Sequence, residues 1–238
     1  MTSSILVTGA NRGIGLEWVR QLVEGAERLF ATCRRPGEAD TLNALAASHP
    51  DTIEVVALDV AEPASRHAAA ERVREKAGAL DLLVNNAGIS GGGERDRFEA
   101  VDQETMMEVF RVNAAGPHLM TKVFADLLRT GAADGSAAVV NLTSQLGSIA
   151  TAKSATWNSY RASKAALNMC TRLQAAALRD DGIIAVALHP GWVRTDMGGS
   201  NARLSPEDSV ADMIDVVADL SLEDTGRFFT HDGSEMPW

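Results

Sequence analysis

One tyrosine and one lysine, Tyr160 and Lys164, are spaced four residues apart, which places both side chains on the same face of a helix. A phenol ordinarily has a pKa of about 10, and an ammonium group one helical turn away favours its ionised form. Each unit by which the pKa falls corresponds to about 1.4 kcal/mol of differential stabilisation. The pair is therefore a candidate for acid–base catalysis, in which Lys164 lowers the pKa of Tyr160.

A glycine-rich turn near the N-terminus is the second candidate. The apolar run at residues 4–8 is followed by Gly9, Gly13 and Gly15, in the pattern Gly-x-x-x-Gly-x-Gly. Glycines there let the backbone turn tightly and approach a pyrophosphate, whose charge is met by free N–H groups and the positive end of a helix that begins near Ile14. Together with the tyrosine and lysine, this turn indicates a nucleotide-dependent redox enzyme.

The elements that must position these residues alternate along the chain, which is typical of a parallel sheet covered on both faces. We predict strands at residues 4–8, 28–33, 53–58, 80–85, 137–143, 183–188 and 227–230. Helices are predicted at residues 14–25, 39–48, 62–78, 103–131, 157–181 and 206–220. The fold class is therefore α/β, a doubly wound Rossmann sheet of about seven strands.

Composition agrees with one such domain spanning residues 1–238, because 45% hydrophobic residues supply a continuous core. The formal charge of −10 argues against a nucleic-acid or anionic-membrane binder. Cys33 and Cys170 cannot form a disulfide framework, and no spaced partners predict a metal site. No signal peptide or apolar run of membrane-spanning length is present, so we expect a soluble, cytoplasmic protein.

Several motifs come directly after predicted strands: the glycine turn, Asp59-Val60, residues 85–88, Ser144 and Pro190-Gly191. In a doubly wound sheet, ligands bind beyond the carboxyl ends of the strands, near the point where the strand order reverses. These motifs should therefore converge at one edge of the sheet. Glycine-rich stretches at 91–93 and 198–201 are expected to be loops within the domain.

These motifs, in this order, resemble the short-chain dehydrogenase/reductase family from Ile5 to nearly the end of the chain. The resemblance rests on the glycine turn, the Tyr–Lys pair, Asn113 and the segments 81–88, 139–144 and 189–196. The phrases at 141–149 and 189–199 and the closing Pro237-Trp238 are similar to the branch that contains C-factor, sniffer and carbonyl reductases.

The resemblance implies a catalytic tetrad. Tyr160 would donate the proton in carbonyl reduction, Ser144 would hold the substrate oxygen, and Asn113 would complete the set through a water relay. Lys164 would lower the tyrosine pKa and bind the nicotinamide ribose. Thr143 is an alternative hydroxyl to Ser144. The resemblance also assigns cofactor-binding residues: Gly9, Asn11, Arg12, Gly13, Ile14, Gly15, Arg34, Asp59, Val60, Asn86, Ala87, Gly88, Tyr160, Lys164, Pro190, Gly191, Val193 and Thr195.

The residue at the end of the second strand predicts the choice of cofactor. Folds that select NADH usually place a carboxylate there, about 20 residues beyond the glycine turn. Here the position is Cys33, followed by Arg34, and Arg12 lies inside the turn. We therefore expect NADP(H), with Arg12 and Arg34 contacting the 2′-phosphate.

The function implied is NADPH-dependent reduction of a ketone, aldehyde or quinone. Two alternatives are an NADP-dependent alcohol dehydrogenase acting on a sugar, steroid or acyl substrate, and a dinucleotide-binding signalling protein of C-factor type. The family also implies a homodimer or homotetramer joined through the helices at 103–131 and 157–181.

Three further residues and one segment near the expected site are interpreted as follows. His189 is interpreted as structural, and Trp157 and Trp192 are candidates for the wall of an apolar pocket or for core packing. The stretch 149–156 makes the gap between Ser144 and Tyr160 longer than is usual in the family, so we expect it to form a small extra loop over the pocket.

Overall fold

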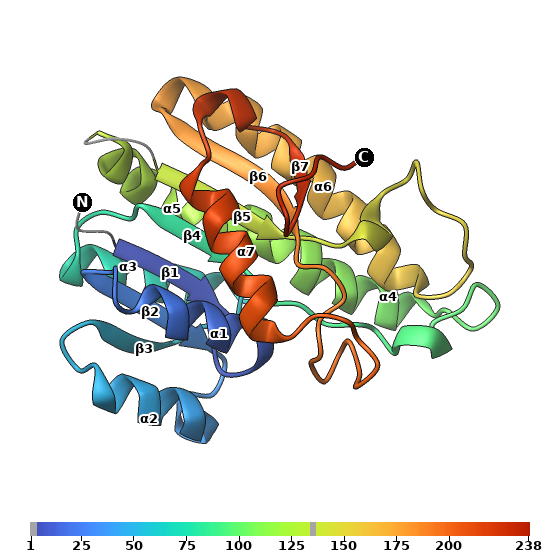
Figure 1. Ribbon diagram of the computed structural model, residues 1–238, viewed down its shortest axis with the longest axis horizontal. Coiled ribbons are helices and arrows are strands. Elements are labelled where there is room, and N and C mark those ends of the chain that lie inside the picture. The colour runs from blue at the N-terminus through green and yellow to red at the C-terminus, as the bar shows by residue number, and fades with distance from the viewer. Residues whose placement is uncertain (1–3, 134–136) are drawn as a thin grey trace.

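The computed structural model describes residues 4–133 and 137–238. Seven parallel strands form one sheet in the order β3-β2-β1-β4-β5-β6-β7, so the strand order reverses between β1 and β4 (Figure 1). The strands are β1 (Ser4–Thr8), β2 (Arg28–Cys33), β3 (Ile53–Ala57), β4 (Leu82–Asn85), β5 (Ala137–Leu142), β6 (Ile183–His189) and β7 (Phe228–Thr230). The predicted fold class is confirmed, and the strand bounds differ from prediction by two residues at most.

Helices cover both faces of this sheet (Figure 1). They are α1 (Gly13–Leu22), α2 (Asp40–Ser48), α3 (Pro63–Lys76), α4 (Gln103–Phe110), α5 (Gly116–Ala132), α6 (Asn158–Leu178) and α7 (Pro206–Ala218). As predicted, α7 begins with Ser205 as its cap, whose hydroxyl accepts a hydrogen bond from the backbone N–H of Asp208 at 3.0 Å.

Side chains on successive strand residues point to opposite faces, and this alternation builds two apolar cores. On β1, Ile5 and Val7 pack into the core beneath α1, α2 and α7, whereas Leu6 packs into the core beneath α3, α5 and α6. Both faces of the central strands are therefore shielded from water, which explains why these strands are apolar throughout.

The helix predicted at 103–131 is interrupted. The chain forms α4, then a π-helical segment at Arg111–Ala115, and then α5. Pro117 lies in the first turn of α5 and has no N–H to offer the carbonyl group of Asn113 four residues earlier. Such π-helical segments are frequent at functional sites, and this one contains Asn113.

Among the residues described, no helix is both long and apolar enough to cross a lipid bilayer.

Candidate active site

The predicted strand-end motifs follow the carboxyl ends of β1, β3, β4, β5 and β6 and so share one edge of the sheet (Figure 1). The two central strands, β1 and β4, flank the point at which the strand order reverses. This is the position where doubly wound sheets bind their ligands.

The glycine turn forms a cradle of bare backbone. Gly9 and Gly13 have positive φ angles of 66° and 53°, which side chains rarely adopt. A β-carbon at Gly15 would collide with the carbonyl oxygen of Gly9 and the side-chain amide of Asn86. No side chain caps the N-terminus of α1 that follows. The exposed N–H groups and the positive end of the helix fit a pyrophosphate.

The segment after β4 supports this cradle from the neighbouring strand. The side-chain amide of Asn86 donates hydrogen bonds to the carbonyl oxygens of Thr8 and Gly9 at 2.7 and 3.1 Å. The backbone N–H groups of Asn86 and Ala87 both donate to the hydroxyl of Thr8, at 2.9 and 3.0 Å. Asn85, one residue earlier, donates to Asn141 at 2.9 Å inside the core. These bonds fix the position of the glycine turn relative to β4.

Tyr160 and Ser144 meet at the start of α6. Ser144 follows β5, and its hydroxyl accepts a hydrogen bond from the N–H of Leu146 at 3.1 Å. It also lies close enough to the phenol of Tyr160 to affect the pKa of that group. Burial raises the pKa of Tyr160 to about 12, and Ser144 opposes part of that rise. The phenol is therefore fully protonated at neutral pH.

Lys164 lies one turn further along α6, with its Nζ 5.7 Å from the centre of the Tyr160 ring. The ammonium donates to the carbonyl oxygen of Leu142 at 2.6 Å. Burial lowers the pKa of Lys164 to about 8. The structure thus gives a tyrosine pKa above its ordinary value, opposite to the direction expected from sequence. Desolvation of the phenol is the dominant cause.

Asn113 faces the loop that follows β4. Its side-chain amide donates to the carbonyl oxygen of Ile89 and accepts from the N–H of Ile89, both at 2.8 Å, and donates to Ser163 at 3.1 Å. Gly88 lies between Asn113 and the Nζ of Lys164, since a β-carbon at Gly88 would come within 3.3 and 3.8 Å of them. Asn113 and Lys164 are therefore neighbours across Gly88.

Thr143, the alternative hydroxyl, points elsewhere. Its Oγ1 donates to Asn168 on α6 at 2.6 Å, and the side chain is buried. Trp157 packs edge-on against Tyr160, with ring centres 5.6 Å apart. Trp192 is about half exposed, and its Nε1 donates to the carbonyl oxygen of Gly198 at 2.8 Å. Ser144 and Trp157 thus contact the tyrosine directly.

The basic residues of the cofactor prediction lie at the same edge. Arg34 is exposed directly after β2 and makes no ion pair within the part of the chain that the structure describes. Arg12 is exposed and forms an ion pair with Asp196, beyond β6. An exposed ion pair of this kind contributes only about 0–1 kcal/mol, so a phosphate can replace Asp196 at small cost.

The other predicted cofactor contacts border the cradle. Thr195 lies against Gly13, as a β-carbon there would touch its methyl group. Asp59 is half-buried, and its carboxylate accepts from the N–H of Ala61 at 2.9 Å, so it shapes the turn before α3. Val60 is buried, and the carbonyl of Pro190 accepts from Ser209 at 2.6 Å. Further predicted positions in these segments are Asn11, Ile14, Gly191 and Val193.

Residues 3–204 match the family described as short chain dehydrogenase. The chain belongs to the short-chain dehydrogenase family. The resemblance found in the sequence motifs is thereby confirmed.

Individual relatives place this short-chain dehydrogenase in the expected branch. It is 44% identical to C-signal of Myxococcus xanthus over 161 residues, which cover 68% of this chain and 94% of that protein. The NADPH-bound carbonyl reductase from chicken fatty liver superimposes with a TM-score of 0.92 at 41% identity, covering 100% of this chain and 99% of the other. Carbonyl reductase Sniffer of D. melanogaster gives 0.94 at 32% identity, with both chains fully covered.

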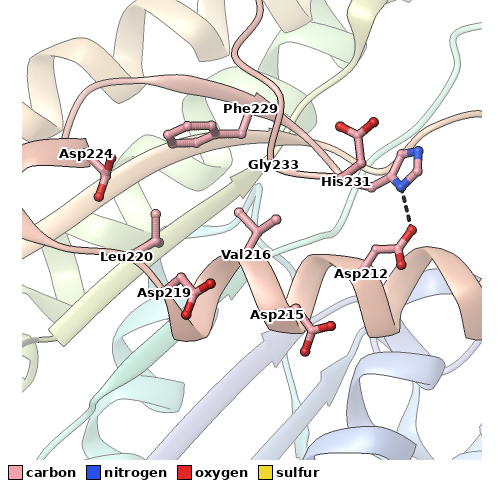
Figure 2. Close-up of a pocket in the computed structure, with 10 residues that line it drawn as sticks. Asp212, Asp215, Val216, Asp219, Leu220, Asp224, Phe229, His231 and Gly233 are labelled. Atoms are coloured by element: carbon pink, nitrogen blue, oxygen red, sulfur yellow. Dashed lines mark hydrogen bonds and ion pairs between the residues drawn. The ribbon is translucent and has the colours of Figure 1, made fainter.

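An acidic cavity of about 450 Å³ lies between α7 and the loop after β7 of this dehydrogenase (Figure 2). Its lining includes Asp212, Asp215 and Asp219 from α7, and Figure 2 shows the ring of His231 directed toward Asp212, 2.8 Å away. None of the predicted site residues lines this cavity.

His189, at the end of β6, has a buried imidazole whose Nδ1 finds no hydrogen-bond partner among the described residues. Burial, and to a smaller extent the nearby His231, lowers the pKa of His189 to about 4. The ring is therefore neutral at pH 7, which agrees with a structural role.

This burial makes stability depend on pH. Between the ordinary pKa of 6.5 and about 4, the unfolded chain binds a proton that folded His189 excludes, so the free energy of unfolding falls as the pH falls. The full effect is about 3 kcal/mol. His189→Gln should remove this part of the acid sensitivity, measured by urea unfolding of both proteins at neutral pH and near pH 4. Equal losses of stability in the two proteins would contradict the assignment.

Proposed function

We propose that the chain is an NADPH-dependent reductase of ketone, aldehyde or quinone carbonyls, with Tyr160 as the proton donor. The observation that carries this proposal is that Ser144 lies beside the partly buried phenol of Tyr160 and lowers its pKa, next to Lys164 at the carboxyl edge of the sheet. A hydroxyl beside a phenol suits a carbonyl oxygen that gains negative charge during reduction.

The protonation state of Tyr160 suits the start of carbonyl reduction. Reduction needs an acid that keeps its proton until an alkoxide forms, and a phenol with a pKa of about 12 meets that need at neutral pH. Alcohol oxidation needs a base, and the same phenol is a poor one unless its pKa falls. The protonated tyrosine is thus the form with which reduction begins, whereas the alcohol dehydrogenase alternative would begin from the ionised form.

The chain's own residues suggest how the cofactor is held. The cradle around Gly9, Gly13 and Gly15 would bind the pyrophosphate, and Lys164 would bind the nicotinamide ribose. Arg12 and Arg34 would contact the 2′-phosphate through charge-assisted hydrogen bonds. When bound, NADPH supplies the hydride. Ser144 then orients the carbonyl oxygen, and Tyr160 delivers the proton to it, with Asn113 supporting proton replacement from solvent.

Lys164→Ala should weaken NADPH binding and slow turnover together, because it removes both a ribose contact and a positive charge near Tyr160. Loss of a charged hydrogen bond corresponds to about a 10- to 100-fold weaker affinity. Fluorescence titration gives the Kd for NADPH, and initial rates give kcat. If both stay at the wild-type values, the role proposed for Lys164 is wrong.

We also propose how many domains the chain forms and how its copies assemble. A single domain spanning residues 1–238 would pair with a second copy through α5 and α6. On α6, Met169 and Leu173 are exposed to 61% and 55%. They are one turn apart, which gives an apolar stripe suited to a dimer or tetramer. Free thiols at Cys33 and Cys170 fit a reducing cytoplasm.

A signalling role is the second candidate, favoured by the 44% identity to C-signal. A panel of aldehydes, ketones and quinones separates the two, with NADPH oxidation followed by absorbance. The reductase proposal expects substrate-dependent NADPH consumption. Saturable NADPH binding without turnover on the whole panel would favour the signalling protein.

A further inference from the structure

The first turn of α6 is capped by a residue from a distant loop. Trp157 precedes the helix in a left-handed conformation, with φ of 59°, and its side chain makes no capping hydrogen bond. The side chain of Asp96 caps the helix instead. Its carboxylate accepts from the N–H of Ser159 at 2.6 Å and from the Ser159 hydroxyl at 3.2 Å. Its backbone carbonyl accepts from the N–H of Asn158 at 3.0 Å.

Asp96 is nearly inaccessible to solvent, with 5% of its surface exposed. Burial of a carboxylate is costly unless hydrogen bonds satisfy it, and the positive end of a helix is a favourable place for it. Hydrogen bonds to a charged acceptor are about twice as strong as neutral ones. The contact between Asp96 and the first turn of α6 is therefore a strong local constraint.

The loop that carries Asp96 connects two members of the predicted tetrad. At its start, Ile89 exchanges two hydrogen bonds with the side chain of Asn113. Near its end, Asp96 holds Ser159, the residue directly before Tyr160. Between them, Gly93 packs against the ring of Trp157, which in turn packs edge-on against Tyr160.

A second set of contacts ties this loop to the segment between Ser144 and α6. Arg97 and Thr156 form an antiparallel bridge, and the N–H of Phe98 donates to the carbonyl of Ala155 at 3.3 Å. Ser144 belongs to the β5 side of the site and Tyr160 to α6. The relative placement of these two hydroxyls therefore depends on how the first turn of α6 is held.

We propose that Asp96 is a positioning residue, which keeps Tyr160 in register with Ser144 by capping α6 from outside the helix. This inference rests on the proposed function, because it assigns Asp96 a part in the reaction carried out by Tyr160. It predicts that loss of the carboxylate harms turnover and leaves cofactor binding intact, since the glycine cradle lies at the start of α1 and Lys164 is held separately by its bond to the carbonyl oxygen of Leu142.

The test compares Asp96→Ala with a matched control, Asp102→Ala. Asp102 caps α4 in the same way, accepting from the N–H of Thr105 at 2.8 Å, and among the described residues its carboxylate hydrogen-bonds Thr105 of its own helix. Misplacement of a reacting group by about 1 Å costs up to about 100-fold in rate, so Asp96→Ala should lower kcat by about 10- to 100-fold. The Kd for NADPH should stay at the wild-type value, and Asp102→Ala should keep the wild-type kcat.

Two further variants separate positioning from general stability. Asp96→Asn keeps an oxygen that can accept from Ser159, so it should recover most of the kcat lost in Asp96→Ala. Asp96→Glu keeps the charge but displaces the carboxylate by one methylene, so its kcat should stay low. If the alanine variant does not fold, the kcat of Asp96→Glu tests the positioning role. In a Tyr160→Phe background, Asp96→Ala should lower the residual rate no further, because it acts through Tyr160.

Amide hydrogen exchange gives a readout independent of turnover. Exchange at residues 158–161 should accelerate in Asp96→Ala and stay unchanged in Asp102→Ala. If the wild type reduces no carbonyl while this exchange pattern appears, the proposed function fails and the capping role stands. Wild-type kcat in both Asp96→Ala and Asp96→Glu would overturn the positioning role.

Discussion

Tyr160→Phe is expected to lower kcat for carbonyl reduction by about 100-fold or more, the usual scale of a positioned acid–base group. The change removes one oxygen atom from a partly buried ring and keeps its packing against Trp157. The fold and the Kd for NADPH should therefore be retained. Steady-state rates with saturating NADPH and a reactive carbonyl measure the loss, and fluorescence titration checks cofactor binding.

The ionisation of Tyr160 can be measured separately, because Tyr160 is the only tyrosine in the sequence. Ultraviolet titration of phenolate absorbance therefore reports this residue alone, with Tyr160→Phe as the blank. Burial predicts a pKa of about 12 in the protein without cofactor. A proton-donor role would be abandoned if Tyr160→Phe reduced carbonyls at a rate close to wild type.

The double variant Cys33→Asp with Arg34→Ala is expected to reverse or erase a preference for NADPH. It places a carboxylate where the ribose hydroxyls of NADH can bind and removes a cation that faces the 2′-phosphate. One charged hydrogen bond accounts for about 10- to 100-fold in affinity. The ratio of kcat/KM for NADPH to that for NADH should fall by about that factor or more, with kcat at saturating cofactor retained.

Arg35→Ala is the matched control, because it removes the same charge one residue away. Arg35 pairs with Glu38 at 2.9 Å, so we expect it to contribute little to the choice of cofactor. Cys33 is buried, and the thermal stability of the double variant must be measured beside the kinetics. Equal wild-type efficiency with NADH and NADPH would refute the assignment of Arg12 and Arg34 before any variant is made.

The sequence predicted the strands and the convergence of motifs well, because both depend on local patterns. Apolar runs bounded by turn residues identify buried parallel strands, and parallel strands bring their carboxyl ends to one edge. The helix at 103–131 was predicted without its break. Pro117 and the polar Asn113 four residues before it were the available signals, and they mark the π-helical segment.

Other features depend on tertiary contacts that no local pattern encodes. The direction of the Tyr160 pKa shift follows from burial, which the sequence does not reveal. Arg12 lies 184 residues from its partner Asp196. Asp96 was not identified from the sequence, because a single carboxylate in a loop gives no sign that it caps a helix 63 residues later.

The most direct test of the account follows deuterium from the C4 position of NADPH into the product of a carbonyl reduction. If the chain is a reductase that uses Tyr160, the wild type should yield an alcohol with one deuterium on the former carbonyl carbon, and Tyr160→Phe should yield at least about 100-fold less. Tight NADPH binding by the wild type, with no deuterated alcohol from any aldehyde, ketone or quinone, would contradict the account.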